Sequence, residues 1–194
     1  FTTYDELRLA TAYLYMKPWF GFHSTRLFAM GDARGNNIYG DNNNETGYAP
    51  YCLFTDKPNT PGLADAWNSL YIVVTQADYI INDYAPQGRQ HFSEAQANAC
   101  EGEARFMRAA AYYYLASYWH DVPIMENPIA HTEAFNMAPT RFEDVIRYGI
   151  RDLEYAAEWL PLADADGRVT RYSALGLLAR YYVTLAAYAR GGHC

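Results

Sequence analysis

Apolar residues recur every three or four positions along most of this 194-residue chain, which is the spacing that places them on one face of an α-helix. Five stretches show this spacing, and segments rich in Gly, Pro or Asn divide them. The stripes are Leu7, Ala10 and Leu14; Trp67, Leu70, Tyr71, Val74, Ala77 and Ile81; Met107, Ala110, Ala111, Tyr114, Leu115 and Tyr118; Phe142, Ile146, Ile150, Leu153, Ala157 and Leu160; and Ala174, Leu177, Leu178, Tyr181, Tyr182 and Leu185. The pattern predicts an all-α fold.

Residues at the edges of the stripes predict where the helices begin and end. In a capping box, a Ser or Thr and a Glu or Gln three residues later each satisfy a free backbone N–H of the first turn. That spacing occurs at Thr3 and Glu6, Ser93 and Gln96, and Thr140 and Glu143, and Thr170 is a further predicted N-cap. Bends or ends are predicted near Pro18, Pro86 and Pro123.

Two of the stripes coincide when one is shifted along the sequence. The stripe that begins at Met107 matches the stripe that begins at Ala174 at all six positions. The stripe at Trp67 likewise resembles the one at Phe142, which predicts two helical hairpins in tandem. We therefore predict one TPR-like helical domain over residues 1–194, with long irregular loops. The alternative is coincidence, since any two amphipathic helices can be slid into register.

Residues 31–62 carry no such stripe and are rich in Gly, Asn and Asp, which favour turns. A loop this long inside a compact domain is uncommon and is often functional. Amide, carboxylate and guanidinium groups can pair with sugar hydroxyls, and aromatic rings can stack on sugar rings. The predicted glycan-binding residues are Trp19, Asp32, Arg34, Asn36, Tyr39, Asn42, Asn43 and Tyr48, with Tyr51 as a further aromatic candidate. The alternatives are a solvated loop of turn residues and, with less support, a cation site.

Composition and charge argue against several classes of function. A net charge of -7 and a pI near 5.1 oppose nucleic-acid binding. No apolar run approaches the roughly 20 residues of a membrane-spanning helix. The histidines are scattered, and the sequence has no spacing typical of a metal site, a nucleophile elbow or a phosphate-binding loop. We therefore predict no catalytic residue, no metal and no cofactor.

Three smaller features favour structural roles. Glu101 and Arg105 stand four residues apart, so a helix would pair them on one face. The acidic run over residues 164–167 lacks the later ligands of a calcium loop and predicts a plain turn. One disulfide is compatible with the three cysteines, and the sequence does not choose the pair among Cys52, Cys100 and Cys194.

Four ordered motifs between Trp67 and Leu185 resemble the SusD/RagB family. The most specific is E-A-R-F-x-R-A-x-x-Y-x-x-L, present over residues 103–115. The others are W-x-x-L-Y from residue 67, ending in A-D where the family has A-N; D-L and L-P within residues 150–161; and G-R-x-T from residue 167, followed by L-L-A-R. The family's G-D-V-P-L segment is H-D-V-P-I over residues 120–124, and His120 in place of Gly argues against a left-handed backbone there.

This resemblance implies a non-enzymatic lipoprotein on the surface of a Gram-negative outer membrane. Such a protein captures oligosaccharides, or peptides in some members, and caps a SusC-type TonB-dependent transporter barrel. The TPR-like helices usually face the transporter, and loops hold the ligand. Family members are typically much longer, so we expect the chain to be an N-terminal portion, with the lipid-bearing cysteine outside it.

Two other functions compete with nutrient capture. A TPR-like scaffold would bind proteins through its helical grooves and no small ligand. It would have no need for the Asn/Asp/Gly-rich loop. An enzyme would need a nucleophile and a base brought together, and the sequence offers no such pair.

Overall fold

The computed structural model describes residues 1–38, 48–128 and 137–191. They form helices and turns, and within these described ranges the one β-type pairing is an isolated bridge between Val122 and Thr140. The helices are α1 (Tyr4–Ala12), η1 (Tyr13–Tyr15), α2 (Lys17–Gly21), η2 (Phe22–Arg26), η3 (Ala29–Ala33), α3 (Ala49–Cys52), α4 (Leu63–Tyr79), η4 (Ile80–Tyr84), α5 (Ala85–Gly88), α6 (Glu94–Trp119), α7 (Phe142–Trp159) and α8 (Arg171–Ala189). The predicted all-α fold is confirmed.

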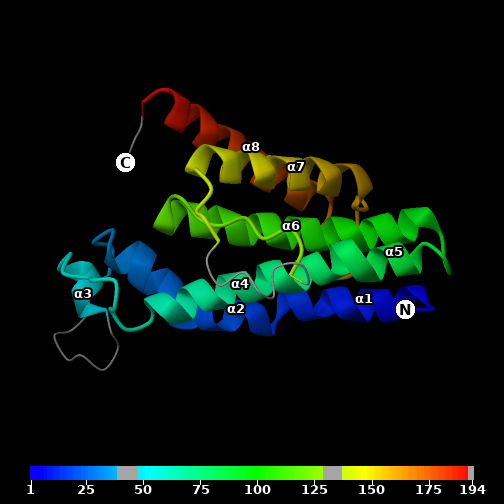
Figure 1. Ribbon diagram of the computed structural model, residues 1–194, viewed down its shortest axis with the longest axis horizontal. Helices are drawn as coiled ribbons and strands as arrows, with labels where there is room; N and C mark the ends of the chain where they lie inside the picture. The colour runs from blue at the N-terminus through cyan, green and yellow to red at the C-terminus, as the bar shows by residue number, and fades with distance from the viewer. Residues whose placement is uncertain (39–47, 129–136, 192–194) are drawn as a thin grey trace.

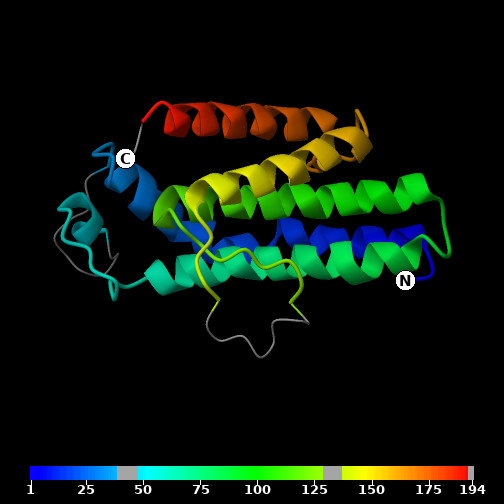
Figure 2. The same cartoon turned by 45° about the horizontal axis from the view of Figure 1, so that its top comes forward.

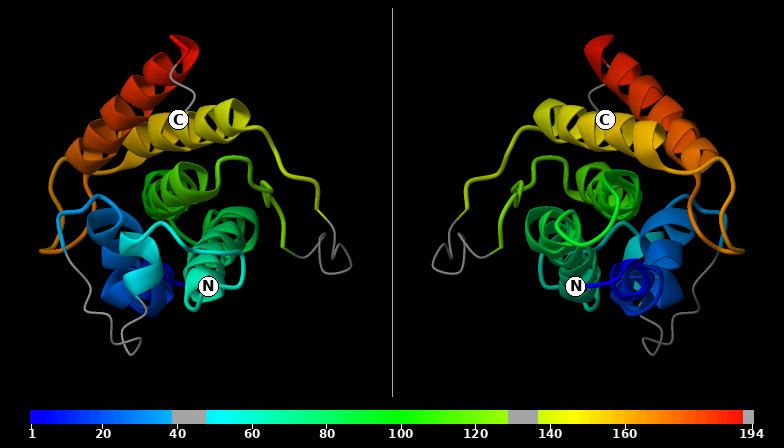
Figure 3. Two further views of the ribbon diagram at one scale, coloured as in Figure 1. Left: turned by 90° about the vertical axis from the view of Figure 1, so that its left-hand side faces the viewer. Right: turned by 90° about the vertical axis from the view of Figure 1, so that its right-hand side faces the viewer.

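The long helix α6 lies at the centre of the molecule (Figures 1 and 3). It runs antiparallel to α4 on one side and to α7 on the other, and α8 returns along α7. The chain therefore forms the two predicted hairpins, α4 with α6 and α7 with α8. The N-terminal helices α1 and α2 pack against α6 and α4. One continuous apolar core joins these elements.

The stripe of the last helix is only partly covered. On α8, Ala174 and Tyr181 are fully buried, whereas Tyr182 is 46% exposed. Gly149 of α7 makes the close approach of Tyr181 geometrically feasible, because a Cβ there would overlap the Tyr181 ring. The Tyr181 hydroxyl crosses to α6 and donates to the carbonyl of Ala109 at 2.6 Å.

Most of the predicted helix ends are confirmed. Thr3 and Ser93 cap α1 and α6 in reciprocal capping boxes with Glu6 and Gln96. Thr170 is the N-cap of α8. The chain bends before Pro18, where α1 gives way to a 3-10 turn and α2 begins at Lys17.

The predicted capping box at Thr140 and Glu143 is wrong. The backbone of Thr140 is instead committed to Val122, through hydrogen bonds of 3.0 and 3.1 Å in both directions. Helix α7 begins at Phe142, and the Phe142 N–H donates to Asp121 Oδ1 at 2.8 Å. A residue 21 positions earlier therefore caps this helix, which no local pattern indicates.

His120 adopts a positive φ, although the replacement of Gly by His predicted that the backbone would avoid one there. At the end of α6 it adopts φ 66° and ψ -94°. Its imidazole Nδ1 is 2.8 Å from Asp121 Oδ1, and its ring stacks on Phe142 with centroids 4.9 Å apart. Contacts of the side chain thus accompany a backbone conformation that ordinarily favours glycine.

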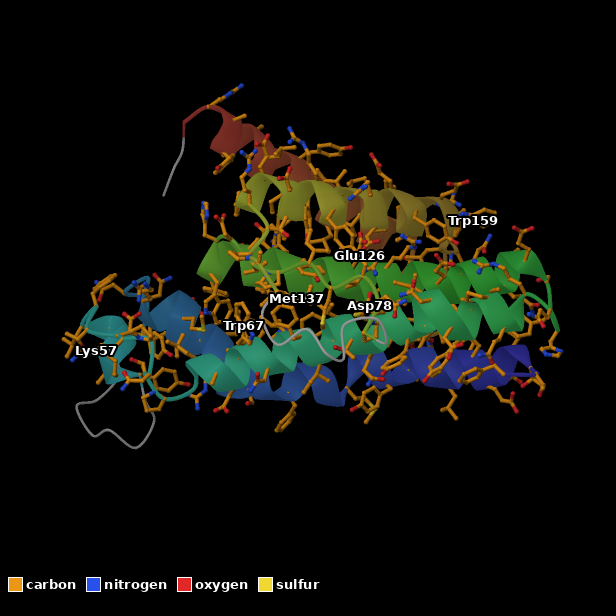
Figure 4. The ribbon with its side chains drawn as sticks, viewed as in Figure 1. Lys57, Trp67, Asp78, Glu126, Met137 and Trp159 are labelled. Carbon is orange, nitrogen blue, oxygen red and sulfur yellow. The ribbon has the colours of Figure 1, made fainter. Side chains whose placement is uncertain are left out.

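A layer of charged side chains crosses the bundle between α4, α6 and α7. Arg108 is 4% exposed and donates to Asp152 through Nε at 2.8 Å and Nη2 at 2.7 Å, and to Asp78 through Nη1. Arg105 extends the layer from Asp152 to Glu101, which confirms the predicted pair four residues apart. Figure 4 shows Asp78 where α4 faces α6. Glu126, in the connection between α6 and α7, lies nearby.

The acidic turn before α8 makes structural contacts with α1. Asp164 accepts from Arg8 in bidentate fashion, with both N–O distances at 2.7 Å. Arg8 lowers the pKa of the Asp164 carboxyl below its ordinary value. Glu103 accepts from Arg8 and Arg168, so these charges join α1, α6 and the turn at residues 164–168. Residues 165–168 form the predicted turn, in which the Arg168 N–H donates to the carbonyl of Ala165 at 3.1 Å.

Candidate functional site

The residues around the predicted loop gather at the end of the molecule opposite the N-terminus (Figures 1 and 2). Two π-helical turns, η2 and η3, lead into this region, and π turns are frequent at functional sites. Residues 31–62 were predicted to form an irregular loop. The structure departs from this prediction, because the segment begins within η3 and contains the one-turn helix α3. Together with the C-terminal end of α6, these turns enclose a hollow.

This first hollow has a volume of about 330 Å³, which is near the lower limit of small-ligand sites. Its walls combine an ion pair, two phenols and apolar side chains. The residues that line it include Met30, Arg34, Tyr51, Asp56, Ser117 and Tyr118. Lys57 marks the outer edge of this region in Figure 4.

Arg34 and Asp56 form the charged wall of the first hollow. Arg34 Nη1 donates to Asp56 Oδ1 at 2.6 Å, and the Arg34 guanidinium lies over the ring of Phe54 at 5.1 Å. The side chains are 43% and 24% exposed, so the pair meets solvent. An exposed guanidinium and carboxylate keep donor and acceptor positions with which sugar hydroxyls can pair.

Tyr51 supplies a buried polar atom to the same hollow. The residue is 1% exposed, and its hydroxyl has no hydrogen-bond partner among the described residues. Burial raises the pKa of this phenol, so it stays protonated and able to donate. A buried hydroxyl without a partner costs about 1–3 kcal/mol, and a ligand oxygen placed in the hollow would remove that cost.

The structure places the predicted glycan-binding residues in different surroundings. Arg34 lines the hollow. The main-chain carbonyl of Asp32 accepts from Asn37 N at 2.9 Å, and Asn36 is exposed with φ 60°. Tyr48 is partly buried against the core. Tyr39, Asn42 and Asn43 lie outside the described residues.

Trp19 is a core residue of this chain. It is 8% exposed, its indole N–H donates to the carbonyl of Leu14 at 2.7 Å, and its ring stacks on His23. It was predicted to stack on a sugar because it is aromatic and lies near the loop. Its contacts place the ring away from the stacking role that was predicted.

Sequence reasoning did not single out Asp56, Ser117 and Tyr118 as site residues. Ser117 and Tyr118 belong to the last turns of a helix whose stripe predicted only packing. Tyr51 was considered as a stacking ring, whereas the structure buries it in the wall of the hollow, with a hydroxyl that has no partner among the described residues. The one available signal was that Asp56 falls inside the Asn/Asp/Gly-rich stretch.

The described residues offer little to metal or thiol chemistry. They contain no group of three His, Cys, Asp or Glu side chains placed to hold a metal ion. They also contain no disulfide: Cys100 is a buried thiol, and burial raises its pKa to about 12. In the described ranges no helix is long and apolar enough to cross a membrane.

Comparison with known proteins identifies the family. A family model described as starch-binding associating with outer membrane, of the SusD-like type, matches residues 21–183. The chain belongs to the SusD-like family. A SusD-like protein from Bacteroides ovatus is 32% identical over 192 residues, which covers 99% of this chain and 34% of that protein.

Solved structures agree with this SusD-like assignment. One crystal structure superposes with a TM-score of 0.86 at 33% identity, covering 94% of this chain and 35% of the other. Another, a complex with a xylogluco-oligosaccharide, has a TM-score of 0.79 at 33% identity and covers 91% of this chain and 34% of the other. The chain thus spans about a third of the length of these SusD-like relatives.

Proposed function

We propose that the intact protein binds oligosaccharides at the outer surface of the cell, and that the first hollow contributes part of the binding site. The observation that carries the proposal is the buried Tyr51 hydroxyl without a described partner, beside the Arg34–Asp56 pair. Support comes from the SusD-like family, described as starch-binding, and from a relative solved with a xylogluco-oligosaccharide. Delivery to a SusC-type TonB-dependent transporter, and a lipid anchor in the intact protein, complete the proposal.

Calorimetric titration tests the glycan proposal directly. The probes are xylogluco-, malto- and laminari-oligosaccharides together with oligopeptides of similar length. We expect one glycan series to bind and the peptides to give no heat. Binding of peptides alone would replace the glycan by a peptide ligand, and binding of neither would refute nutrient capture by this site.

Substitution of Tyr51 by Phe separates binding from folding. The change removes the unpartnered hydroxyl and keeps the ring, so we expect the free energy of unfolding to stay equal or rise. Glycan affinity should fall about tenfold, which corresponds to the loss of one buried hydrogen bond of about 1.4 kcal/mol. Arg147→Met, on the exposed face of α7, is the control; it should leave glycan affinity unchanged and cost at most about 1 kcal/mol of stability. Unchanged affinity in Tyr51→Phe would exclude the hydroxyl from the site.

A protein-binding scaffold without a small ligand is the second candidate. The observation in its favour is the group of exposed apolar side chains on α8, namely Tyr172, Leu175, Tyr182 and Val183. This candidate predicts that the intact protein co-purifies with its transporter while all the sugars fail to bind. This candidate would be supported if substitutions on α8 abolish contact with the transporter and leave glycan affinity unchanged.

A further inference from the structure

A second hollow lies on the other side of the last turns of α6. It has a volume of about 350 Å³ and lies between the end of α6, the start of α7 and the end of α8. These three helix ends meet at the same end of the molecule as η3 and α3 (Figure 2). The residues that line this second hollow include Ser117, His120, Phe142, Val183, Thr184 and Tyr188.

Ser117 belongs to both hollows. Its side chain is exposed and small, and its hydroxyl donates to the carbonyl of Tyr113 at 2.7 Å. The hydroxyl oxygen keeps lone pairs that can accept from a ligand. The two hollows are therefore neighbours across one helical turn, with a small polar residue between them.

The two hollows differ in chemistry. The first presents the Arg34–Asp56 ion pair and lies against the buried Tyr51. The second presents the His120 ring, whose side chain is 50% exposed. This ring stacks on the buried Phe142 with centroids 4.9 Å apart at 19°, and Phe142 in turn lies 4.9 Å from Tyr188 at 37°. Sugars offer hydroxyl edges to the first kind of surface and apolar ring faces to the second.

The rings of the second hollow are held in place before any ligand arrives. Asp121 Oδ1 contacts both the imidazole Nδ1 of His120 and the backbone N–H of Phe142, each at 2.8 Å. The bond from Phe142 lowers the pKa of Asp121, so the carboxylate stays charged in this role. Thr184 Oγ1 donates to the carbonyl of Arg180 at 3.0 Å, which fixes a further hydroxyl beside the rings. Fixed groups lose little entropy when a ligand binds.

We propose that a single oligosaccharide spans both hollows, crossing α6 at Ser117, with its polar edges in the first and a ring face on the half-exposed His120 imidazole in the second. This inference rests on the proposed function and adds that the ligand is a chain too long for either hollow alone. Each hollow is near the lower limit for small-ligand sites, so a short oligosaccharide fills one and only a longer chain fills both.

Chain-length dependence of affinity in the intact protein tests this inference. Short and long members of the xylogluco-, malto- and laminari-oligosaccharide series are titrated by calorimetry. We expect the long member of the bound series to bind at least about tenfold more tightly, with one molecule per protein. Equal affinity for both lengths would overturn the inference and leave the proposed function standing. Failure of every series to bind would overturn both.

Two variants locate the extra affinity. His120→Gly removes the imidazole but tolerates the positive φ, and Val183→Arg places a long charged chain at a position that is 70% exposed beside the rings. Both should reduce the affinity for the long oligosaccharide to that for the short one and leave the short one unchanged. Equal losses for both lengths, or no loss, would overturn the inference.

Leu175→Arg supplies the matched control. Leu175 is exposed on the same helix α8 as Val183, two turns nearer its start, and does not line the second hollow. The variant should bind both lengths as the unmodified protein does. Circular dichroism and the thermal midpoint confirm that all three variants remain folded. A length-specific loss in Leu175→Arg as large as that in Val183→Arg would also overturn the assignment.

Discussion

Arginine–aspartate pairs occur in two contrasting regions of this molecule. In the middle of the bundle, Arg108 is 4% exposed and forms ion pairs with Asp78 and Asp152, both of which are buried. At the loop end, Arg34 pairs with Asp56 while its side chain remains 43% exposed. The charged groups are of the same kind, but the side chains of the first group are at most 5% exposed, whereas those of the second pair are 43% and 24% exposed. The difference teaches that burial, and not residue type, separates a structural ion pair from one available to a ligand.

The buried layer is costly to disturb. Burial works against the charge on Arg108, yet the carboxylates of Asp152 and Asp78 raise its pKa well above the ordinary value. Asp78 Oδ2 has no hydrogen-bond partner in the described part of the chain. The layer thus holds one carboxylate oxygen unsatisfied at the position where the family pattern has Asn. Removal of Arg108 and replacement of Asp78 should therefore have opposite effects.

The largest expected effect is that of Arg108→Met. It leaves Asp78 and Asp152 buried with one cation fewer, so we expect the free energy of unfolding to fall by about 3–5 kcal/mol. Urea denaturation followed by circular dichroism measures the change. Arg147→Met removes an exposed arginine paired with Glu143 and should cost at most about 1 kcal/mol. Similar losses in both variants would show that burial does not distinguish the two regions.

The next effect is the pH dependence of stability that Asp78 produces. Burial raises the pKa of its carboxyl to about 7, although Arg108 opposes the shift and Asp152 and Glu126 add to it. The folded protein thus retains a proton that the unfolded chain releases near pH 3.8. The stability from this group is complete below that value and is lost as the pH rises towards about 7.

Asp78→Asn should abolish this dependence. The amide oxygen still accepts from Arg108, and the amide does not titrate. Between pH 5 and 7 the unmodified protein should lose about 2–3 kcal/mol relative to the variant, at roughly 1.4 kcal/mol per pH unit. Denaturation of both proteins at several pH values measures the difference. Parallel pH curves for the two proteins would contradict the assignment to Asp78.

A smaller effect is expected from Gly149→Ala, which tests packing within the bundle without altering charge. A Cβ at this position would overlap the Tyr181 ring, so overpacking should cost about 1–3 kcal/mol despite the higher helix propensity of Ala. Gly176→Ala on α8 is the control, because a Cβ there meets nothing within 4 Å. It should stabilise the protein by up to about 1 kcal/mol. A stabilising Gly149→Ala would show that α7 and α8 can move apart at little cost.

The smallest expected effect on stability is that of Arg34→Met. Exposed ion pairs contribute about 0–1 kcal/mol, so thermal unfolding should hardly change. Glycan affinity should fall at least about tenfold, because a charge-assisted hydrogen bond contributes about 1.5–3 kcal/mol. Calorimetry and a thermal scan of the same sample measure both quantities. A large loss of stability without loss of binding would give Arg34 the structural role that Arg108 has.

Sequence reasoning predicted the scaffold better than the site. The capping boxes at Thr3 and Ser93 and the pair of Glu101 with Arg105 were predicted correctly, because each partner lies within one helical turn of the other. The cap of α7 was missed, since Asp121 reaches it from 21 residues away. For the site, Arg34 was predicted to bind and lines the hollow, whereas Trp19 lies in the core.

By itself, the sequence determined the helices, most of their ends and the family, because periodicity, capping and motifs are local properties of the chain. Only the tertiary structure decided which charges are buried, that the Tyr51 hydroxyl is left without a described partner, and that Ser117 lies between two hollows. Those facts depend on segments far apart in sequence. A local pattern of hydrophobic and polar residues carries no information on which distant side chains share a cavity. That arrangement sets the dielectric environment of each charged group and its access to water and ligands.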